Sequence, residues 1–310
     1  MKESKNKSVD VILCCYNQQD YIAQAVESIL KQKVDAPVRI LVADDCSTDH
    51  TIDIIKKYEP LSPFKFVYLN DAKNLGLHAN YRRAFAAVEA KYTAILEGDD
   101  WWQKENHLSQ HIQFLEKHKR HSMSFNLITN YFQNNGKSTV MRWPYDDLDH
   151  ITINLRAQIS WGNQIGNLSS CVFRSVFLHE LPDDFFKLKY ADWELGIMMA
   201  LKGPIALLRE STSTYRINDQ GQWTSLTSKN KQLSQQRSLQ ELEPLLPSYC
   251  HPYIKNYNKQ LDSHSQPPFP IPFKYRIKNI VKGHLGYVQK ILPHNNSSKK
   301  NNRHKIIYYE

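Results

Sequence analysis

Short apolar runs alternate with amphipathic segments along the first half of the chain. The runs are rich in β-branched residues, whereas in the longer segments apolar residues recur every three or four positions, as on one face of a helix. The runs predict strands at residues 9–15, 38–43, 64–69, 92–96 and 123–131, and the longer segments predict helices at 21–32, 51–58, 79–89 and 105–119. This alternation predicts an α/β fold with a mainly parallel central sheet flanked by helices.

The second half is less regular. Asn134-Asn135-Gly136 predicts a hairpin turn, and weaker patterns predict strands at 171–173 and 205–208, a buried helix at 192–201 and a short helix at 241–246. The proline-rich segment 266–272 excludes a helix or a central strand and predicts a linker. Beyond it, the apolar residues of 277–292 lie near one helical face, and the chain ends in a polar, basic stretch.

These shifts in pattern along the chain predict a main domain at 1–250, with halves of about 8–131 and 132–250, and an extension at 251–310. The extension holds eleven Lys and Arg residues and two acidic ones, which accounts for the whole net charge of +9. Because the main domain is electrically balanced, we expect no nucleic-acid groove in it. The basic extension predicts either contact with an anionic membrane surface or a helix packed on the main domain.

Cysteine content and apolar runs bear on cellular location. Five cysteines without a Cys-x-x-Cys pair argue against a disulfide framework and against a structural zinc site. We find no secretory signal, and no apolar run approaches the ~20 residues that span a bilayer. The sequence therefore predicts a cytoplasmic protein, with the basic extension as a candidate attachment to the inner face of the cell membrane.

An acidic segment, Glu97-Gly98-Asp99-Asp100, directly follows the strand predicted at 92–96. Carboxylates crowded at the end of a buried strand repel one another and lose hydration, and a divalent cation offsets both costs. Oxygen ligands suit Mg²⁺ or Mn²⁺, which commonly bind phosphate oxygens as well. The segment is therefore a candidate metal–diphosphate site. The alternative is an acidic turn that caps the helix beginning near Lys104.

A second acidic pair, Asp44-Asp45, follows the strand predicted at 38–43. Its carboxylates can accept hydrogen bonds from a base N–H or a ribose hydroxyl, whereas the alternative is a turn that caps the next helix. Ser47, Thr48 and Asp49 suffice for that cap, so Asp44 and Asp45 remain candidates for ligand binding.

Four segments in this order carry a family resemblance: VDVILCCYN at 9–17, DDCSTD at 44–49, NLG at 74–76 and LEGDDWW at 96–102. With them the chain resembles the family 2 glycosyltransferases, which have the GT-A fold. The resemblance covers residues 8–225 and is densest before residue 131. It implies a nucleotide-sugar-binding sheet and transfer of a sugar from a nucleotide donor with inversion at the anomeric carbon.

The resemblance implies roles in donor binding. Asp45 would contact the nucleotide base with Asp44 beside it, and Cys14 and Tyr16 would line the same pocket.

The acidic segment matches the family motif that meets ribose, diphosphate and metal. Asp100 would hold the metal, with help from Asp99 or from Glu97, which occupies the first acidic position of the motif. Trp101 is adjacent, and its ring is either a wall for the sugar or part of the core.

A further match places the general base at Asp192, in the helix start at 190–195, followed by family-like residues at 215–216 and 221–223. A positioned carboxylate can remove the proton of an acceptor hydroxyl, a contribution of roughly 10²–10⁴-fold. The alternative is that Asp192 only caps the helix and that Glu194 pairs with a neighbouring base.

The chain departs from the family pattern at three positions. Cys14 stands where proline is common, Cys46 where glycine is common and Asn218 where many members have histidine. The last change leaves the third metal ligand open, with His78 and His107 as candidate replacements.

The sequence thus leads to the hypothesis of a metal-dependent inverting glycosyltransferase of bacterial surface polysaccharide synthesis. Its donor would be a nucleotide sugar, with UDP-sugars the first expectation, and its acceptor a glycan or a lipid-linked glycan. A catalytically inactive protein that binds sugar nucleotides is one alternative. A nucleotidyltransferase is a weaker one, because the chain lacks an early glycine-rich, basic phosphate loop.

Overall fold

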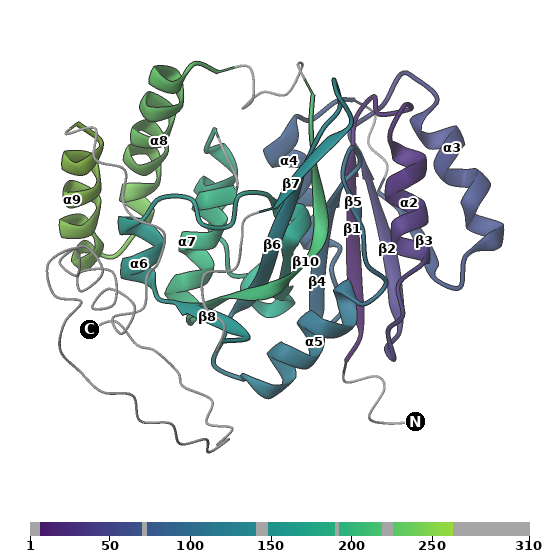
Figure 1. Ribbon diagram of the computed structural model, residues 1–310, viewed down its shortest axis with the longest axis horizontal. Coiled ribbons are helices and arrows are strands. Elements are labelled where there is room, and N and C mark those ends of the chain that lie inside the picture. Colours follow the sequence, from purple (N-terminus) through teal and green to yellow (C-terminus); the bar gives the residue numbers. More distant parts are fainter. Residues whose placement is uncertain (1–6, 70–72, 141–147, 190–191, 219–225, 263–310) are drawn as a thin grey trace, which may run out of the picture.

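The computed structural model describes residues 7–69, 73–140, 148–189, 192–218 and 226–262, which form a mixed α/β fold around one curled sheet (Figure 1). The sheet has ten strands, and its main path runs β3-β2-β1-β4-β9-β6-β10-β5. The strands of the first half pair in parallel, as predicted: β1 (Val9–Cys15), β2 (Val38–Asp44), β3 (Lys65–Tyr68) and β4 (Tyr92–Glu97).

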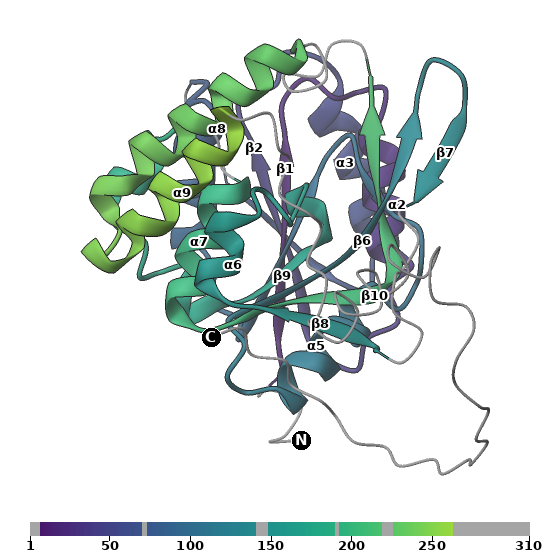
Figure 2. The ribbon, with the colours of Figure 1, turned by 60° about the vertical axis from the view of Figure 1, so that its left-hand side comes forward.

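The second half of the sheet mixes directions. β9 (Cys171–Arg174) lies antiparallel between β4 and β6 (Met123–Phe132), and β6 pairs in parallel with β10 (Ile205–Ile217). The short strands β5 (Trp101–Trp102), β7 (Lys137–Val140) and β8 (His150–Ile153) pair antiparallel at the periphery. The predicted turn at 134–136 joins β6 to β7 in a hairpin that extends from the body (Figure 2).

Strand β10 is far longer than the predicted strand at 205–208. Its continuation is polar, and it rejoins β6 after a register shift between Leu208 and Ser213. Because its side chains are polar, this continuation was not predicted as a strand, although its backbone groups are paired in the sheet.

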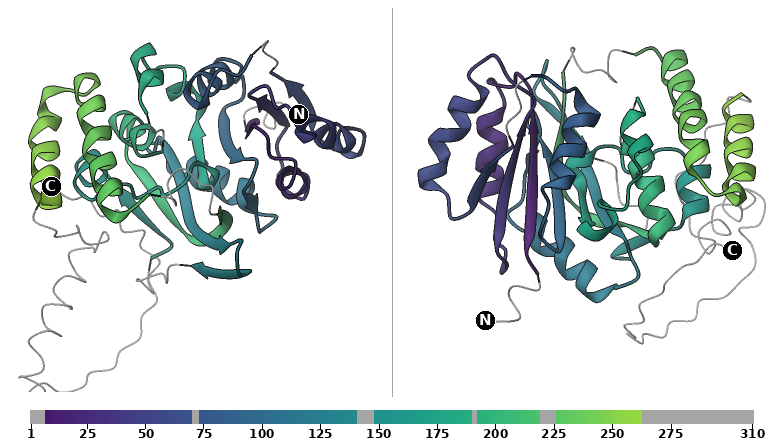
Figure 3. Two further views of the ribbon diagram at one scale, coloured as in Figure 1. Left: turned by 90° about the horizontal axis from the view of Figure 1, so that it is seen from above. Right: turned by 180° about the vertical axis from the view of Figure 1, so that it is seen from behind.

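Helices cover both faces of the sheet (Figure 3). One face carries α2 (Ile22–Leu30), α3 (Thr51–Tyr58) and α5 (His107–Lys117), and the other carries α4 (Leu77–Ala86), α6 (Leu155–Ser160) and α7 (Asp192–Lys202). Every residue of β1 is buried, with alternate side chains in two separate cores. This two-sided burial explains why the strand reads as a continuous apolar run.

The two C-terminal helices, α8 (Ser228–Leu242) and α9 (His251–Asp262), lie side by side beyond α7 (Figure 2). The short helix predicted at 241–246 is not a separate element: residues 241–242 end the longer helix α8, and Glu243–Leu245 form a 3₁₀ turn. α8 is largely polar and buries chiefly Leu239 and Leu242, so its apolar periodicity is weak. Further 3₁₀ turns lie at Glu59–Leu61, Leu168–Ser170, Ser175–Phe177, Asp183–Lys187 and Ser248–Cys250.

The predicted division at residue 250 falls directly before α9. This helix packs on α6 and places Ile254 and Tyr257 in the larger core, so the packed part of the chain continues to Asp262. The predicted linker at 266–272 and amphipathic helix at 277–292 lie outside the described residues. None of the described helices combines the length and the apolar character that a membrane span requires.

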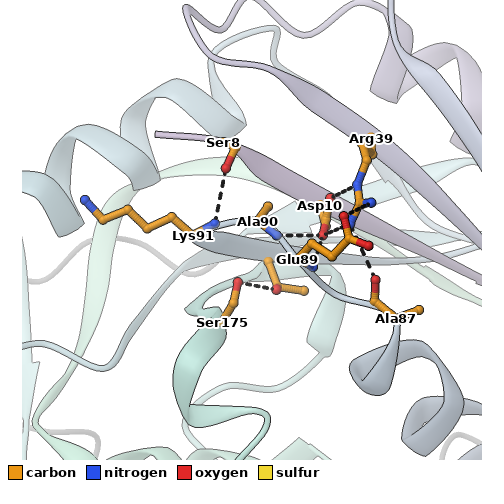
Figure 4. A network of polar contacts seen from close by, with 9 residues as sticks. Ser8, Asp10, Arg39, Ala87, Glu89, Ala90, Lys91 and Ser175 are labelled. Carbon is orange, nitrogen blue, oxygen red and sulfur yellow. Dashed lines mark hydrogen bonds and ion pairs between the residues drawn. The ribbon is translucent and has the colours of Figure 1, made fainter. Parts of the chain in front are cut away.

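A polar network ties the amino ends of β1 and β2 to the turn before β4 (Figure 4). Asp10 is fully buried, and its carboxylate accepts hydrogen bonds from Arg39 Nε (2.8 Å) and Nη2 (2.7 Å). The amides of Glu89 (2.7 Å) and Ala90 (2.9 Å) complete its partners. All the hydrogen-bonding needs of this carboxylate are met within the protein.

Candidate active site

Three predicted site segments meet at the opposite edge of the sheet, where β1, β2 and β4 end. The register aligns Cys14 with Ala43 on one side and with Glu97 on the other, so the acidic segments after β2 and β4 flank the end of β1. Burial raises the pKa of the Cys14 thiol, and the charges of Glu97 and Asp45 raise it further. Ligands in such sheets bind at the carboxyl ends of the strands.

The acidic turn after β4 does not cap a helix. Its residues lead into β5, and α5 begins later, at His107, with Asn106 as the preceding cap residue. Gly98 lies so close to β1 and α2 that a Cβ there would come within 2.2 Å of Gln18 Oε1 and 3.1 Å of Cys15 Cβ. The turn is therefore packed down onto the sheet, and the helix-cap alternative fails.

Asp100 is the most firmly held carboxylate of the turn. It is 1% exposed, and its Oδ2 accepts hydrogen bonds from Ser169 Oγ (2.6 Å) and Asn167 Nδ2 (2.8 Å). Its Oδ1 accepts from the amide of Arg216 (2.8 Å). Burial raises its pKa, and the charges of Asp99 and Glu97 add to that shift.

Glu97 links the acidic turn to Asp192, which begins α7. The Glu97 carboxylate accepts hydrogen bonds from Tyr81 Oη (3.1 Å) and Asn167 Nδ2 (3.1 Å). Burial raises its pKa first, and the nearby charges of Asp192 and Asp99 raise it further. Burial likewise raises the pKa of Asp192, followed by the charges of Glu194 and Asp100. Asp192 and the acidic turn are therefore near enough for their charges to interact.

The donor set fits a divalent cation shared with a phosphate ligand. Within the described ranges, none of Glu97, Asp99, Asp100 and Asp192 forms an ion pair with a basic side chain. Burial raises the pKa of Asp99, and the charge of Arg216 opposes that shift in part. Their oxygens are hard ligands, and Mg²⁺ commonly uses one or two carboxylates, waters and substrate phosphates. In the described part of the chain, no group of three or more Asp, Glu, His or Cys residues is arranged to hold a metal ion.

One of the two histidines suggested as replacement ligands, His107, lies in the core. His107 is fully buried, its ring stacks on Trp102 (4.4 Å between centroids), and its Nδ1 lies 2.8 Å from Thr212 Oγ1. The suggestion that His107 is a ligand is therefore wrong, because core packing takes up this side chain.

The second acidic pair organises the loops around the end of β2. Asp45 is 5% exposed, and its two oxygens accept hydrogen bonds from the amides of Leu75 (2.7 Å) and Gly76 (2.8 Å). Asp44 accepts from the amide of Ser47 (2.9 Å) and from its hydroxyl. These contacts clamp the segment 74–76 onto the end of β2.

The helix cap predicted from Ser47, Thr48 and Asp49 comes from Asp49 alone. Its Oδ1 accepts a hydrogen bond from the amide of Thr51 (2.9 Å), the first residue of α3, whereas Ser47 turns back to Asp44. Cys46 between them has φ +64°, the left-handed region in which glycine is favoured. Tyr16 is 46% exposed at the end of β1 and is free to meet a ligand.

The two adjacent tryptophans differ in burial. Trp102 is 3% exposed and donates its indole N–H to the carbonyl of Ser169 (2.9 Å). Trp101 is half-buried, with its ring edge-on to Tyr131 (5.4 Å) and beside the Arg216 guanidinium (4.8 Å). The family-like residues at 221–223 and the start of the segment 190–195 lie outside the described residues.

The acidic turn has three partners that the sequence patterns did not predict: Asn167, Ser169 and Tyr81. A signal exists for the first two: a polar stretch, residues 166–170, directly precedes the apolar strand β9. Because β9 runs antiparallel to β4, its start lies at the same edge as the end of β4. The strand was predicted but its direction was not, so these partners could not be placed.

This sheet, with acidic segments at neighbouring strand ends and a carboxylate at a facing helix start, has the architecture of a GT-A glycosyltransferase. Residues 10–175, more than half of the 310-residue chain, match the family model of glycosyl transferase family 2. The chain belongs to this family, which confirms the family and fold class predicted from the four sequence segments.

Curated relatives include an uncharacterized protein of Mycobacterium tuberculosis, 28% identical over 220 residues, 70% of this chain and 61% of that protein. The chain therefore spans less than two thirds of that relative. The putative teichuronic acid biosynthesis glycosyltransferase TuaG of Bacillus subtilis is 35% identical over 108 residues, 34% of this chain and 41% of TuaG. The Escherichia coli UDP-Glc:alpha-D-GlcNAc-diphosphoundecaprenol beta-1,3-glucosyltransferase WfaP is 32% identical over 111 residues, 36% of this chain and 42% of WfaP.

Two solved structures are similar in fold. S. aureus TarS in complex with UDP-GlcNAc has a TM-score of 0.56 and 19% identity, over 82% of this chain and 73% of that chain. The mannosyltransferase PcManGT from Pyrobaculum calidifontis, in complex with GDP-Man and Mn²⁺, has a TM-score of 0.57 and 13% identity, over 89% of this chain and 80% of that chain.

Proposed function

We propose that the chain moves a sugar from a nucleotide-sugar donor, with UDP-sugars as the first choice, to an acceptor hydroxyl with inversion at the anomeric carbon. The observation that carries this proposal is the position of Asp192. It begins α7, and its charge raises the pKa of Glu97 at the end of β4.

Asp192 acts as the general base. An acceptor hydroxyl must lose its proton as it attacks, and a base is more effective when its pKa lies near the working pH. Burial and the neighbouring carboxylates raise the pKa of Asp192 in that direction. The acceptor oxygen then displaces the diphosphate from the opposite face of the sugar, so no enzyme nucleophile is needed.

Asp100, Asp99 and Glu97 form the diphosphate side of the site. A divalent cation, Mn²⁺ or Mg²⁺, held by Asp100 and Asp99 would neutralise the negative charge that grows on the leaving diphosphate. The contacts from Ser169 and Asn167 keep the Asp100 carboxylate in one orientation before any ligand binds. Trp101 forms the wall beside this turn.

The nucleoside lies at the end of β2. Each Asp45 oxygen accepts one amide hydrogen bond and keeps lone-pair capacity for a base N–H. Asp44, Cys14 and the exposed ring of Tyr16 complete this side of the pocket.

We place the enzyme in bacterial surface polysaccharide or lipid-linked glycan synthesis, at the inner face of the cell membrane. The names of TuaG and WfaP support this assignment, because they refer to teichuronic acid and to a diphosphoundecaprenol-linked sugar. The basic residues of 251–310 would attract anionic lipid, at about 1 kcal/mol per basic residue near the surface. Liposome sedimentation of the full chain against a chain ending at Asp262 tests this attachment, and equal binding of both refutes it.

The reaction is tested by product analysis and by Asp192→Asn. With a UDP-sugar, Mn²⁺ and an acceptor glycan, the wild type should release UDP, whereas a nucleotidyltransferase would exchange pyrophosphate. Asp192→Asn should bind UDP normally in calorimetry and lose transfer. Asp183→Asn is the matched control, since Asp183 is exposed and pairs with the exposed Arg82. A wild type that binds UDP without transfer to any glycan acceptor would support the inactive-protein alternative.

A further inference from the structure

Arg216, near the end of β10, is a buried arginine that contacts the acidic turn at several points. It is 6% exposed, and its backbone amide donates to Asp100 Oδ1 (2.8 Å). Its Nε donates to the carbonyl of Asp99 (2.7 Å), its Nη2 to Gln24 Oε1 (2.6 Å) and its Nη1 to Gln133 Oε1. One side chain thus connects the acidic turn to α2 and to the end of β6.

Aromatic rings surround the same guanidinium. Its centre lies 4.7 Å from the ring of Tyr21, 4.8 Å from that of Trp101 and 5.6 Å from that of Tyr131. Within the part of the chain that the structure describes, the guanidinium has neutral oxygens as hydrogen-bond partners and forms no ion pair with a carboxylate. The N–H groups of the planar guanidinium donate to these oxygens in three directions, and the aromatic rings stabilise its positive charge.

We propose that Arg216 is a positioning residue for the donor. It fixes the turn 99–101 against α2 and β6, so that the Asp99 carboxylate and the Trp101 ring keep one orientation toward the nucleotide sugar. This inference rests on the proposed function, since it concerns the same donor site. A planar guanidinium can hold these separate contacts at once, whereas a lysine ammonium would keep the charge and lose the fork.

Arg174 on β9 provides a matched control. It too is held by neutral carbonyls, with Nε donating to His121 (2.7 Å) and Nη2 to Leu115 (2.6 Å), and it lies against the ring of Tyr92 (5.8 Å). It is paired with the first residue of β4, at the far end of the strand from the acidic turn. Substitution there disturbs a similar but only partly buried network, at a distance from the donor site.

The experiment compares Arg216→Lys with Arg174→Lys by calorimetric titration with UDP and Mn²⁺. Both variants should lose thermal stability, but only Arg216→Lys should weaken UDP binding, by at least ~10-fold, with a raised KM for the donor. Gln24→Ala and Gln133→Ala each remove one acceptor and should weaken binding less. These milder variants keep the test valid if Arg216→Lys does not fold.

A second measurement uses the free protein. Arg216→Lys should shift tryptophan emission, and the shift should vanish in a Trp101→Phe background. Equal UDP affinity in Arg216→Lys and Arg174→Lys would overturn the positioning role while leaving the proposed function intact. A wild type that binds no nucleoside diphosphate would instead overturn the proposed function and the inference with it.

Discussion

Buried carboxylates at the two ends of the same parallel strands have opposite surroundings. At the amino ends, Asp10 is fully buried and receives four hydrogen bonds, two of them from Arg39. At the carboxyl ends, Glu97, Asp100 and Asp192 crowd together, and burial and mutual repulsion raise the pKa of each. The first arrangement stabilises the fold, whereas the second costs stability unless a ligand supplies positive charge.

This contrast separates structural from functional acidic residues. A buried charge that is paired and hydrogen-bonded holds elements together, and its removal damages folding. A cluster of like charges at a strand edge is retained for what it binds, since stability alone would favour its loss. Whether a buried carboxylate has a pairing partner therefore indicates its role better than how deeply it is buried.

The largest effect on stability should come from the amino-end network. Asp10→Ala leaves Arg39 without its buried partner and should lower the free energy of unfolding by about 3 kcal/mol. Denaturant titration measures this change. Glu89→Gln removes the exposed ion pair of the same arginine and should cost less than about 1 kcal/mol. Equal losses in both variants would contradict the structural role of Asp10.

The carboxyl-end cluster should make stability fall as pH rises. Glu97 and Asp192 have pKa values raised above those of the unfolded chain, so the folded state binds more protons between their unfolded and folded pKa values. The loss should reach about 1–2 kcal/mol between about pH 6.5 and 8.5. Denaturant unfolding at several pH values checks it.

The buried histidines do not contribute to this change at higher pH. Burial lowers the pKa of His111 and His121 to about 4, so both are neutral in the folded and the unfolded protein above the unfolded value of 6.5. They lower the stability of the protein only at more acidic pH. Mn²⁺ with UDP should reduce the loss at the higher pH, because bound positive charge offsets the cluster. A stability that rises with pH across this window would refute the crowding of these carboxylates.

Removing one member of the cluster should stabilise the free protein. Asp192→Asn should raise the unfolding free energy at pH 8 by roughly 0.5–2 kcal/mol while abolishing transfer. The gain is reduced because a carboxylate at a helix start also interacts favourably with the helix dipole. A destabilised Asp192→Asn protein would show that the carboxylate is structural, like Asp10.

The smallest effect concerns the turn that carries Asp44 and Asp45. Cys46→Gly should raise stability by about 0.5 kcal/mol, because glycine relieves the positive φ but adds freedom to the unfolded chain. Cys46→Ala is the control, since it removes the thiol and keeps the backbone cost. If both variants change stability equally, backbone conformation is not the cause.

Much of the first half of the fold was predictable from the sequence because its signals are local. Fully buried parallel strands give apolar runs, and the helices between them have one apolar face, so α2 to α5 and β1 to β4 fall close to their predicted positions. The same holds for both acidic segments, which follow directly from the strand ends. Here sequence neighbours are also structural neighbours.

The second half was less predictable because its stabilising contacts are distant in sequence. β10 is polar over much of its length and is held by backbone pairing with β6 and β5. α8 has little apolar periodicity and is ordered by packing of Leu239 and Leu242. Neither element has a clear apolar pattern in the sequence, because its order depends on contacts with residues that are distant in the chain.

The sequence by itself indicated the family, the order of α2 to α5 and β1 to β4, and the acidic residues at the ends of β2 and β4. Only the tertiary structure decided which further groups hold those residues: Asn167 and Ser169 from the start of an antiparallel strand, and Arg216 from β10. The physical reason is that strand direction and helix placement depend on packing between distant segments. The sequence of one segment indicates only which of its own side chains are buried.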